Sequence, residues 1–166
     1  MAGLLRNRSP RATFLCYHSI AERGPRFLTV TPELFGRQLD ELERRGVGTG
    51  GLAELERAAA GELESPTAFL TFDDGFIDNH ATVLPMLEER GMRAFVFVLP
   101  PLVDEGAPLE WPEVEEDLRA HPATMRSVDW GQLGEMRDGA FEVGSHTLTH
   151  PHLPGVSAER LREELS

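Results

Sequence analysis

Two short strings hold the residues of this chain that are best suited to chemistry. The string TFDDG at residues 71–75 places two adjacent carboxylates, Asp73 and Asp74, at the end of an apolar run, and HTLTH at residues 146–150 places two imidazoles four residues apart. Two histidines and one carboxylate are a common ligand set for a catalytic divalent metal that keeps one position open for water. The other carboxylate is then free to act as a base. The two strings together predict a metal-assisted hydrolase.

The aspartate pair carries a cost that needs an explanation. Adjacent carboxylates repel each other, so a pair at a strand end is unfavourable unless a cation or hydrogen-bond donors offset the repulsion. At a strand end Asp73 and Asp74 can diverge, so that one binds metal and the other faces a substrate, while Gly75 permits a turn or a close backbone approach. Taken alone, the same residues also fit an ordinary Asp-Gly turn. Mg²⁺-dependent phosphoryl transfer is a rival, but phosphatases usually space their two aspartates two residues apart, and here they are adjacent. No GxxxxGK loop is present either, and Mg²⁺ chemistry would leave the two histidines without a role.

The histidine pair suits the same ion. His146 and His150 fall on one side of the chain if their segment makes a helical turn, and neutral imidazole is a good ligand near pH 7. For the spacing alone, a pair of surface or capping histidines is the alternative. Three of the six histidines lie between residues 146 and 152, which favours the metal site. His152 fits a surface or supporting position better than that of a third ligand.

The order of elements places both strings at strand ends. We expect strands at residues 12–17, 68–72, 93–99 and 140–144 and helices at 31–45, 52–60, 78–90, 128–137 and 157–165, with some helix near 113–120. Thr31, Asp129 and Ser157 are expected to cap their helices, and Pro85 predicts a kink. Alternating strands and helices indicate an α/β fold with a parallel sheet, in which active sites gather at the strand carboxyl ends.

Composition narrows the class of protein. The 166 residues suffice for one domain, and a net charge of −12 argues against nucleic acid as a partner. The single cysteine, Cys16, excludes an internal disulfide and is expected to be a small buried hydrophobe. No apolar run reaches the roughly 20 residues of a membrane helix, and no signal peptide is visible. The chain as given is expected to be cytoplasmic, or extracellular or cell-wall-associated if a leader is missing.

Longer strings around both motifs are similar to a known family. TFDDGF at 71–76, LPMLEERGMRAFVFV at 84–98 and FEVGSHTLTHPHL at 141–153 resemble the polysaccharide deacetylase family, which is carbohydrate esterase family 4 or the NodB-homology domain. LCYHSI at 15–20 resembles the first strand in a bacterial branch of it. The likeness covers residues 12–166, leaving 1–11 as a disordered extension. It implies a partial, distorted (β/α) barrel that removes N-acetyl groups from amino-sugar polymers or oligomers.

The resemblance also implies roles for the residues of the two strings. Asp73 matches the catalytic base, and Asp74, His146 and His150 match the metal ligands, for zinc or in some members another divalent ion. Family members continue with an Arg-containing motif, a Tyr whose backbone donates to the oxyanion, and a Leu-x-His whose histidine is the general acid. None of these follows His150 here. We therefore expect the early part of a longer enzyme, with a non-catalytic metal- or carbohydrate-binding module on the same scaffold as the alternative.

Five further residues have weaker assignments. His18 stands at the end of the first strand, where either a site residue or a structural histidine at the sheet rim would fit. Thr149, and with it Ser145, is expected to orient the histidine loop. Trp111 and Trp130 could stack on a sugar ring, but packing is the favoured interpretation for both.

Overall fold

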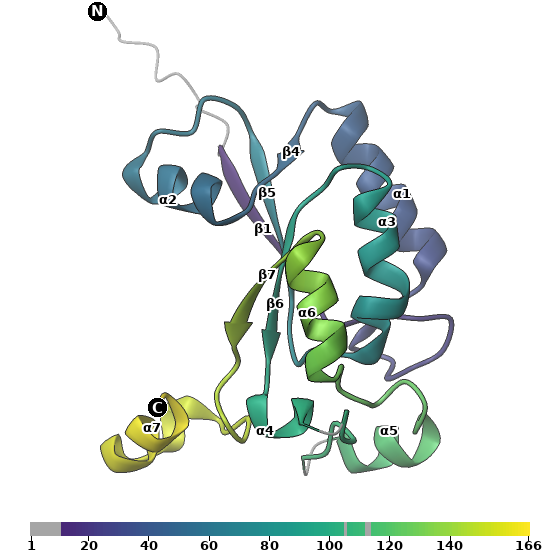
Figure 1. Ribbon diagram of the computed structural model, residues 1–166, viewed down its shortest axis with the longest axis vertical. Coiled ribbons are helices and arrows are strands. Elements are labelled where there is room, and N and C mark those ends of the chain that lie inside the picture. Colours follow the sequence, from purple (N-terminus) through teal and green to yellow (C-terminus); the bar gives the residue numbers. More distant parts are fainter. Residues whose placement is uncertain (1–10, 105, 112–113) are drawn as a thin grey trace, which may run out of the picture.

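A parallel sheet forms the centre of the computed structural model, which describes residues 11–104, 106–111 and 114–166 (Figure 1). The sheet order is β1-β5-β6-β7, and β4 pairs with the start of β5. All of these pairings are parallel. The strands are β1 (Ala12–Tyr17), β4 (Gly48–Thr49), β5 (Thr67–Phe72), β6 (Ala94–Val98) and β7 (Phe141–Ser145). The predicted α/β class is confirmed, and the four main predicted strands lie within two residues of their expected bounds.

The sheet of described strands is open, because β1 and β7 do not pair with each other. It is thus a barrel that is partial, as predicted, and not closed. β5 and β6 lie inside the sheet, and β1 and β7 are its outer strands. Phe14 on β1 is 58% exposed and Val143 on β7 is 41% exposed, whereas β5 and β6 are almost entirely buried. The near-continuous apolar sequences of β5 and β6 match this burial on both faces.

Helices cover both faces of the sheet. The helices are α1 (Pro32–Arg44), α2 (Leu52–Ala60), α3 (Leu84–Glu88), α4 (Pro100–Val103), α5 (Glu115–Ala120), α6 (Trp130–Asp138) and α7 (Ala158–Glu164). Alternate residues of β5 and β6 serve the two faces. Leu70 and Val96 join the core cluster that includes α1, α3 and α6, while Phe69 and Phe95 pack toward α2. Figure 1 shows α2 across the sheet from those three helices.

The predicted helix caps are confirmed. The side chain of Thr31 accepts a hydrogen bond from Leu34 N, and Pro32 occupies the first turn of α1. Asp129 accepts from Gln132 N at 2.9 Å and begins α6. Ser157 accepts from Arg160 N at 3.1 Å and begins α7. Each cap satisfies an amide that the helix itself leaves without a partner.

The helix expected at 78–90 is interrupted. A π-helical turn, η1 (Asn79–Val83), precedes α3, and Leu84 N donates to Asn79 O across five residues. Pro85 has no N–H for the usual bond to residue 81, so the widened turn takes up the break that Pro85 predicted. Buried Asp78, just before η1, accepts from Ser19 Oγ and Ile20 N, both at 2.8 Å. These bonds fix β2 (Ser19–Ile20), which pairs with β3 (Thr29–Val30), against the segment that follows the aspartates.

Two expectations change or fall outside the structure. The prediction that Cys16 is buried is wrong: the thiol is exposed, because β1 is an outer strand of the sheet. Residues 1–10 of the expected extension lie outside the described residues, and the carbonyl of Arg11 accepts from Thr67 N at 2.7 Å. Within the described part of the chain, no helix has the length and apolarity needed to cross a bilayer.

Candidate metal centre

The aspartate half of the site is set by the end of β5. Asp73 N donates to Tyr17 O at 2.9 Å, which extends the β1–β5 pairing by one residue. Asp74 then has φ 68° and Gly75 has φ 69°, so the chain turns sharply and the two carboxylates separate. A Cβ on Gly75 would lie 2.7 Å from Cγ1 of Val98 on β6. The glycine is therefore required both by its backbone conformation and by its packing.

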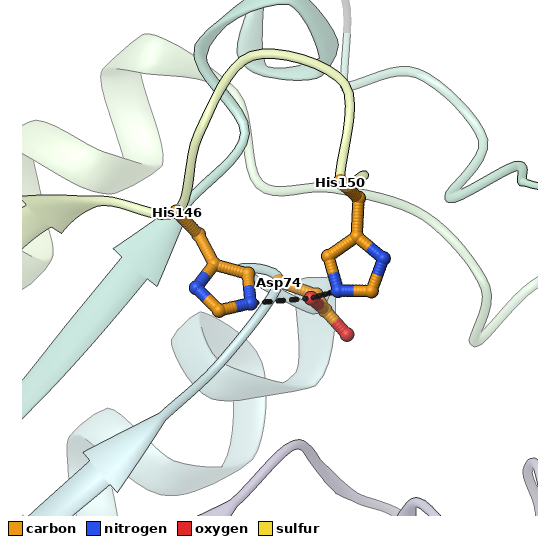
Figure 2. A group of neighbouring side chains, drawn as sticks. All are labelled: Asp74, His146 and His150. Carbon is orange, nitrogen blue, oxygen red and sulfur yellow. Dashed lines mark ion pairs between the residues drawn. The ribbon is translucent and has the colours of Figure 1, made fainter. Parts of the chain in front are cut away.

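The histidine half follows β7. His146 N donates to Val98 O at 2.7 Å, which continues the β6–β7 pairing past Ser145. The next residues make no helical turn. The helical turn expected to bring His146 and His150 to one side is therefore not what aligns them. Instead Thr147 has φ 70° and His150 has φ 54°, and His150 N donates to Thr147 Oγ1 at 3.2 Å. These two left-handed residues reverse the chain, so that both rings point toward Asp74 (Figure 2).

The three predicted ligands converge. Asp74 Oδ1 lies 3.6 Å from His146 Nε2 and 3.5 Å from His150 Nε2. Zinc bonds of about 2.0–2.2 Å at tetrahedral angles separate neighbouring ligand atoms by about 3.3–3.6 Å, so the spacing suits that ion. Within the described residues, this is the one group of three His, Cys, Asp or Glu side chains with ligand atoms within 4.8 Å of one another.

Asp74 shows independently that a cation suits this position. The residue is 1% exposed, and its Oδ1 accepts no hydrogen bond from the described residues. Burial, followed by the charge of Asp73, raises the pKa of Asp74 to about 7. A buried carboxylate oxygen without a donor is costly, and a metal ion is one group that would satisfy it. The two nitrogens and one oxygen are a donor set that zinc accepts.

Asp73 lies apart from the ligand group. Its Oδ2 is 3.3 Å from Cys16 Sγ, at the ends of the paired strands β5 and β1. Partial desolvation, followed by the charge of Asp73, raises the pKa of the Cys16 thiol, so the S–H is retained at neutral pH and can donate to the carboxylate. No local sequence pattern indicates this contact, because it depends on the register of two strands.

His18 also belongs to this neighbourhood. Desolvation lowers the pKa of His18, Asp73 opposes that shift and His146 adds to it. The imidazole therefore responds to both halves of the site. Its carbonyl accepts from Asn79 Nδ2 at 2.8 Å, which holds the chain after β1 in place.

A pocket of about 510 Å³ opens beside the histidines. It is lined by Trp111, His146, Thr147, His150, Pro151, His152 and Leu153. The ring centroids of Trp111 and His150 are 4.5 Å apart, and the indole also packs on the small core of Phe76 and Leu109. The packing prediction for Trp111 is therefore confirmed, and the indole also lines the pocket, where the alternative of stacking on a sugar ring would place it. Trp130 is 52% exposed and donates to Asp104 instead.

Solved structures with known assignments share this fold. The chain aligns with the Streptococcus pyogenes deacetylase PplD in complex with acetate, with a TM-score of 0.71 and 25% identity over 91% of this chain and 62% of that one. IcaB from Ammonifex degensii gives a TM-score of 0.66 and 25% identity, covering 92% of this chain and 58% of that one. BC0361, a polysaccharide deacetylase from Bacillus cereus, gives 0.66 and 24%, covering 92% and 43%, and at that identity supports the fold alone.

Sequence comparisons agree with the structural ones. The Bacillus subtilis (strain 168) protein YxkH, which carries a provisional polysaccharide deacetylase name, is 25% identical over 154 residues, covering 92% of this chain and 48% of that protein. The chain thus spans about half the length of this curated relative. A family model described as polysaccharide deacetylase matches residues 60–166, more than half of the chain and the part that holds both motifs. The chain belongs to the polysaccharide deacetylase family.

Proposed function

We propose that this chain holds the metal site and the base of a metal-dependent deacetylase that hydrolyses N-acetyl groups on amino-sugar polymers or oligomers. The observation that carries the proposal is the convergence of Asp74, His146 and His150, with Asp73 beside them on the same strand end. The relatives support the reaction class, since PplD is described as a deacetylase and was solved with acetate. The net reaction joins water to an acetamide and yields acetate and a free amine.

The ligand group would hold a divalent ion, and zinc fits its donors best. When bound, such an ion supplies Lewis-acid polarisation of a carbonyl and lowers the pKa of a water molecule. Asp74 provides the carboxylate ligand, and the two imidazoles provide nitrogen through Nε2, the atoms that face it. Both rings are about one-third exposed, so the open side of the group faces the pocket and is accessible to a substrate.

Asp73 is the proposed base. It lies next to Asp74 in sequence yet outside the ligand group, and it is more exposed than Asp74. One of its oxygens faces the Cys16 thiol, which leaves the other available to take a proton. A carboxylate within reach of the attacking water would contribute about 10²–10⁴-fold to the rate.

The pocket suits an acetamide on a sugar ring. Trp111 and Leu153 give it apolar walls next to the histidines, as a methyl group or the face of a pyranose requires. These walls support an N-acetylated amino sugar as the substrate of the proposed reaction. A non-catalytic module on the same scaffold is the alternative, and it predicts zinc binding without acetate release.

Metal analysis and an acetate assay test the proposal together. The wild-type chain should bind about one zinc, and the His146→Ala/His150→Ala variant should lose at least about a thousandfold in affinity, because two of three protein ligands are gone. Asp73→Asn should keep zinc but release no acetate from N-acetylglucosamine oligomers. Equal zinc in the wild type and the double variant would contradict the metal site. In the complete protein, zinc binding without acetate release would favour the non-catalytic module, and full activity in Asp73→Asn would exclude the base assignment.

A further inference from the structure

A buried carboxylate supports the loop between the two histidines. Glu164 is the last residue of α7, the yellow helix beside the loop that follows β7 in Figure 1, and it is 2% exposed. Its Oε2 accepts from Leu148 N and Thr149 N, each at 2.9 Å, and its Oε1 accepts from Thr149 Oγ1 at 2.6 Å. Arg160, one turn earlier, places its guanidinium 2.6 Å from the same Oε1. Both carboxylate oxygens are thus fully engaged.

The buried charge of Glu164 needs these partners, since a buried charge is unfavourable unless it is paired and hydrogen-bonded. Three donors from the loop and one cation from α7 supply that compensation, and hydrogen bonds to a charged acceptor are the stronger kind. The hydrogen bond from Thr149 is the main reason why the pKa of Glu164 lies below its ordinary range. Glu164 therefore stays ionised and keeps accepting from the loop.

The loop needs support at the point where Glu164 provides it. His146 is tied to β6 through its backbone, but residues 147–150 have no strand pairing. Thr147 and His150 both have positive φ, a conformation that costs free energy and persists only where its surroundings enforce it. Leu148 and Thr149 lie between them, and Glu164 holds the amides of both.

We propose that Glu164 is a positioning residue for the metal centre. Its carboxylate fixes the backbone of Leu148 and Thr149, and through it the spacing of His146 and His150 around Asp74. The inference rests on the proposed function, since it takes these three residues as metal ligands. Without Glu164 the loop would sample other conformations, and the ion would have to order it on binding, which weakens the apparent affinity.

The adjacent residue on α7 offers a matched control. Glu163 also pairs with Arg160, at 3.0 Å, but its side chain is 58% exposed and no hydrogen bond joins it to the loop. Glu164→Gln and Glu163→Gln each remove one charge from the same helix. Both substitutions replace two acceptor oxygens by one acceptor and one donor. Only in Glu164→Gln do those oxygens accept from the loop, so at least one loop amide or hydroxyl loses its acceptor.

The experiment measures the zinc dissociation constant by competition with a chromogenic chelator, together with the thermal midpoint of the metal-free protein. We expect Glu164→Gln to weaken zinc binding about 10–100-fold, the range found when groups that orient metal ligands are lost. Glu163→Gln should stay within about twofold of wild type, as exposed ion pairs contribute little. If Glu164→Gln does not fold without metal, Thr149→Val replaces it. This change removes the hydrogen bond from Thr149 Oγ1 to Glu164 and the one that Thr149 Oγ1 accepts from Arg160, and it should weaken zinc binding about threefold or more.

The outcomes separate this inference from the proposed function. Unchanged zinc affinity in Glu164→Gln, whatever its thermal midpoint, would show that Glu164 only stabilises the fold and would overturn the inference. Equal weakening in Glu163→Gln would overturn it too, because a general charge effect would then explain the result. Undiminished zinc binding by His146→Ala/His150→Ala would instead overturn the metal site on which the inference rests.

Discussion

The two halves of the site are supported in different ways. The aspartates follow β5, an inner strand flanked by β1 and β6, while the histidines follow β7, an outer strand. Asp74 is 1% exposed, whereas the two histidine side chains are each about one-third exposed, at 32% and 33%. Main-chain pairing and a buried glycine shape the first half, and a side chain from α7 holds the second. The aspartate half is therefore part of the core, and the histidine half is attached to it.

This contrast has a consequence for stability. Changes in the aspartate half should alter the stability of the whole fold, because this half is built from the end of β5, which is part of the core. Changes in the histidine half should alter the site and leave the sheet intact. Substitutions in the two halves can therefore break or sharpen this contrast.

The charge of Asp74 should make the metal-free protein less stable as pH rises. Its folded pKa of about 7 lies above the ordinary value of 3.8, so the folded state binds the extra proton between these values. The stabilisation that this proton gives the folded state is complete below about pH 4 and is lost as pH rises through 7. The free energy of unfolding changes by up to about 4 kcal/mol over that range. Asp74→Asn should abolish this dependence and raise the free energy of unfolding above pH 7, as measured by denaturant titration across pH.

Asp73→Asn provides the comparison for Asp74→Asn. The charge of Asp73 is the second cause of the raised pKa of Asp74, after burial. Its removal should stabilise the metal-free protein in the same direction but by less. The same pH profile in the wild type and Asp74→Asn would mean that Asp74 is not buried as a charge in the folded protein.

Gly75→Ala should destabilise the fold by about 2–3 kcal/mol. The alanine would have to adopt a positive φ, and its Cβ would lie 2.7 Å from Cγ1 of Val98. Chemical denaturation in the absence of metal measures this. Gly134→Ala in α6 is the control, because a Cβ there meets nothing within 4 Å and helix propensity favours alanine by about 1 kcal/mol. A neutral Gly75→Ala would show that the end of β5 adjusts easily, and the contrast between the halves would fail.

Trp111→Leu should have the smallest effect, and it should fall on the substrate. The indole lines the pocket beside His150, so its loss should raise KM for an N-acetylglucosamine oligomer about tenfold, with a smaller change in kcat. Zinc affinity should stay close to wild type. Steady-state kinetics and the chelator competition separate the two quantities. A loss of zinc affinity with unchanged KM would assign Trp111 to the support of His150 instead.

Much of the fold follows from local rules and was predictable. The caps at Thr31, Asp129 and Ser157 depend on a few neighbouring residues, and the strand ends next to the motifs follow from apolar runs. The three ligand candidates come from two strings, and the parallel sheet that joins them follows from the alternation of elements. The structure brings all three together, and their role in binding metal stays a prediction.

The remaining features depend on contacts that no local pattern encodes. Glu164 reaches residues 15 and 16 positions earlier, and only the docking of α7 brings it there. Thr147 is β-branched, and nothing in its type predicts a positive φ. The exposure of Cys16 depends on which strand lies next to β1, and Trp111 reaches the pocket through the packing of an irregular segment.

The contact between Cys16 and Asp73 gives the site a natural labelling position. The chain has one cysteine, so a thiol-directed fluorophore or spin label would attach at a single point, on an exposed sulfur 3.3 Å from the proposed base. Because the thiolate is the reactive form and the pKa of this thiol is raised, labelling should be slow at neutral pH and should become faster as the pH rises. A slower rate of Cys16 labelling would then report that a ligand occupies the space beside Asp73.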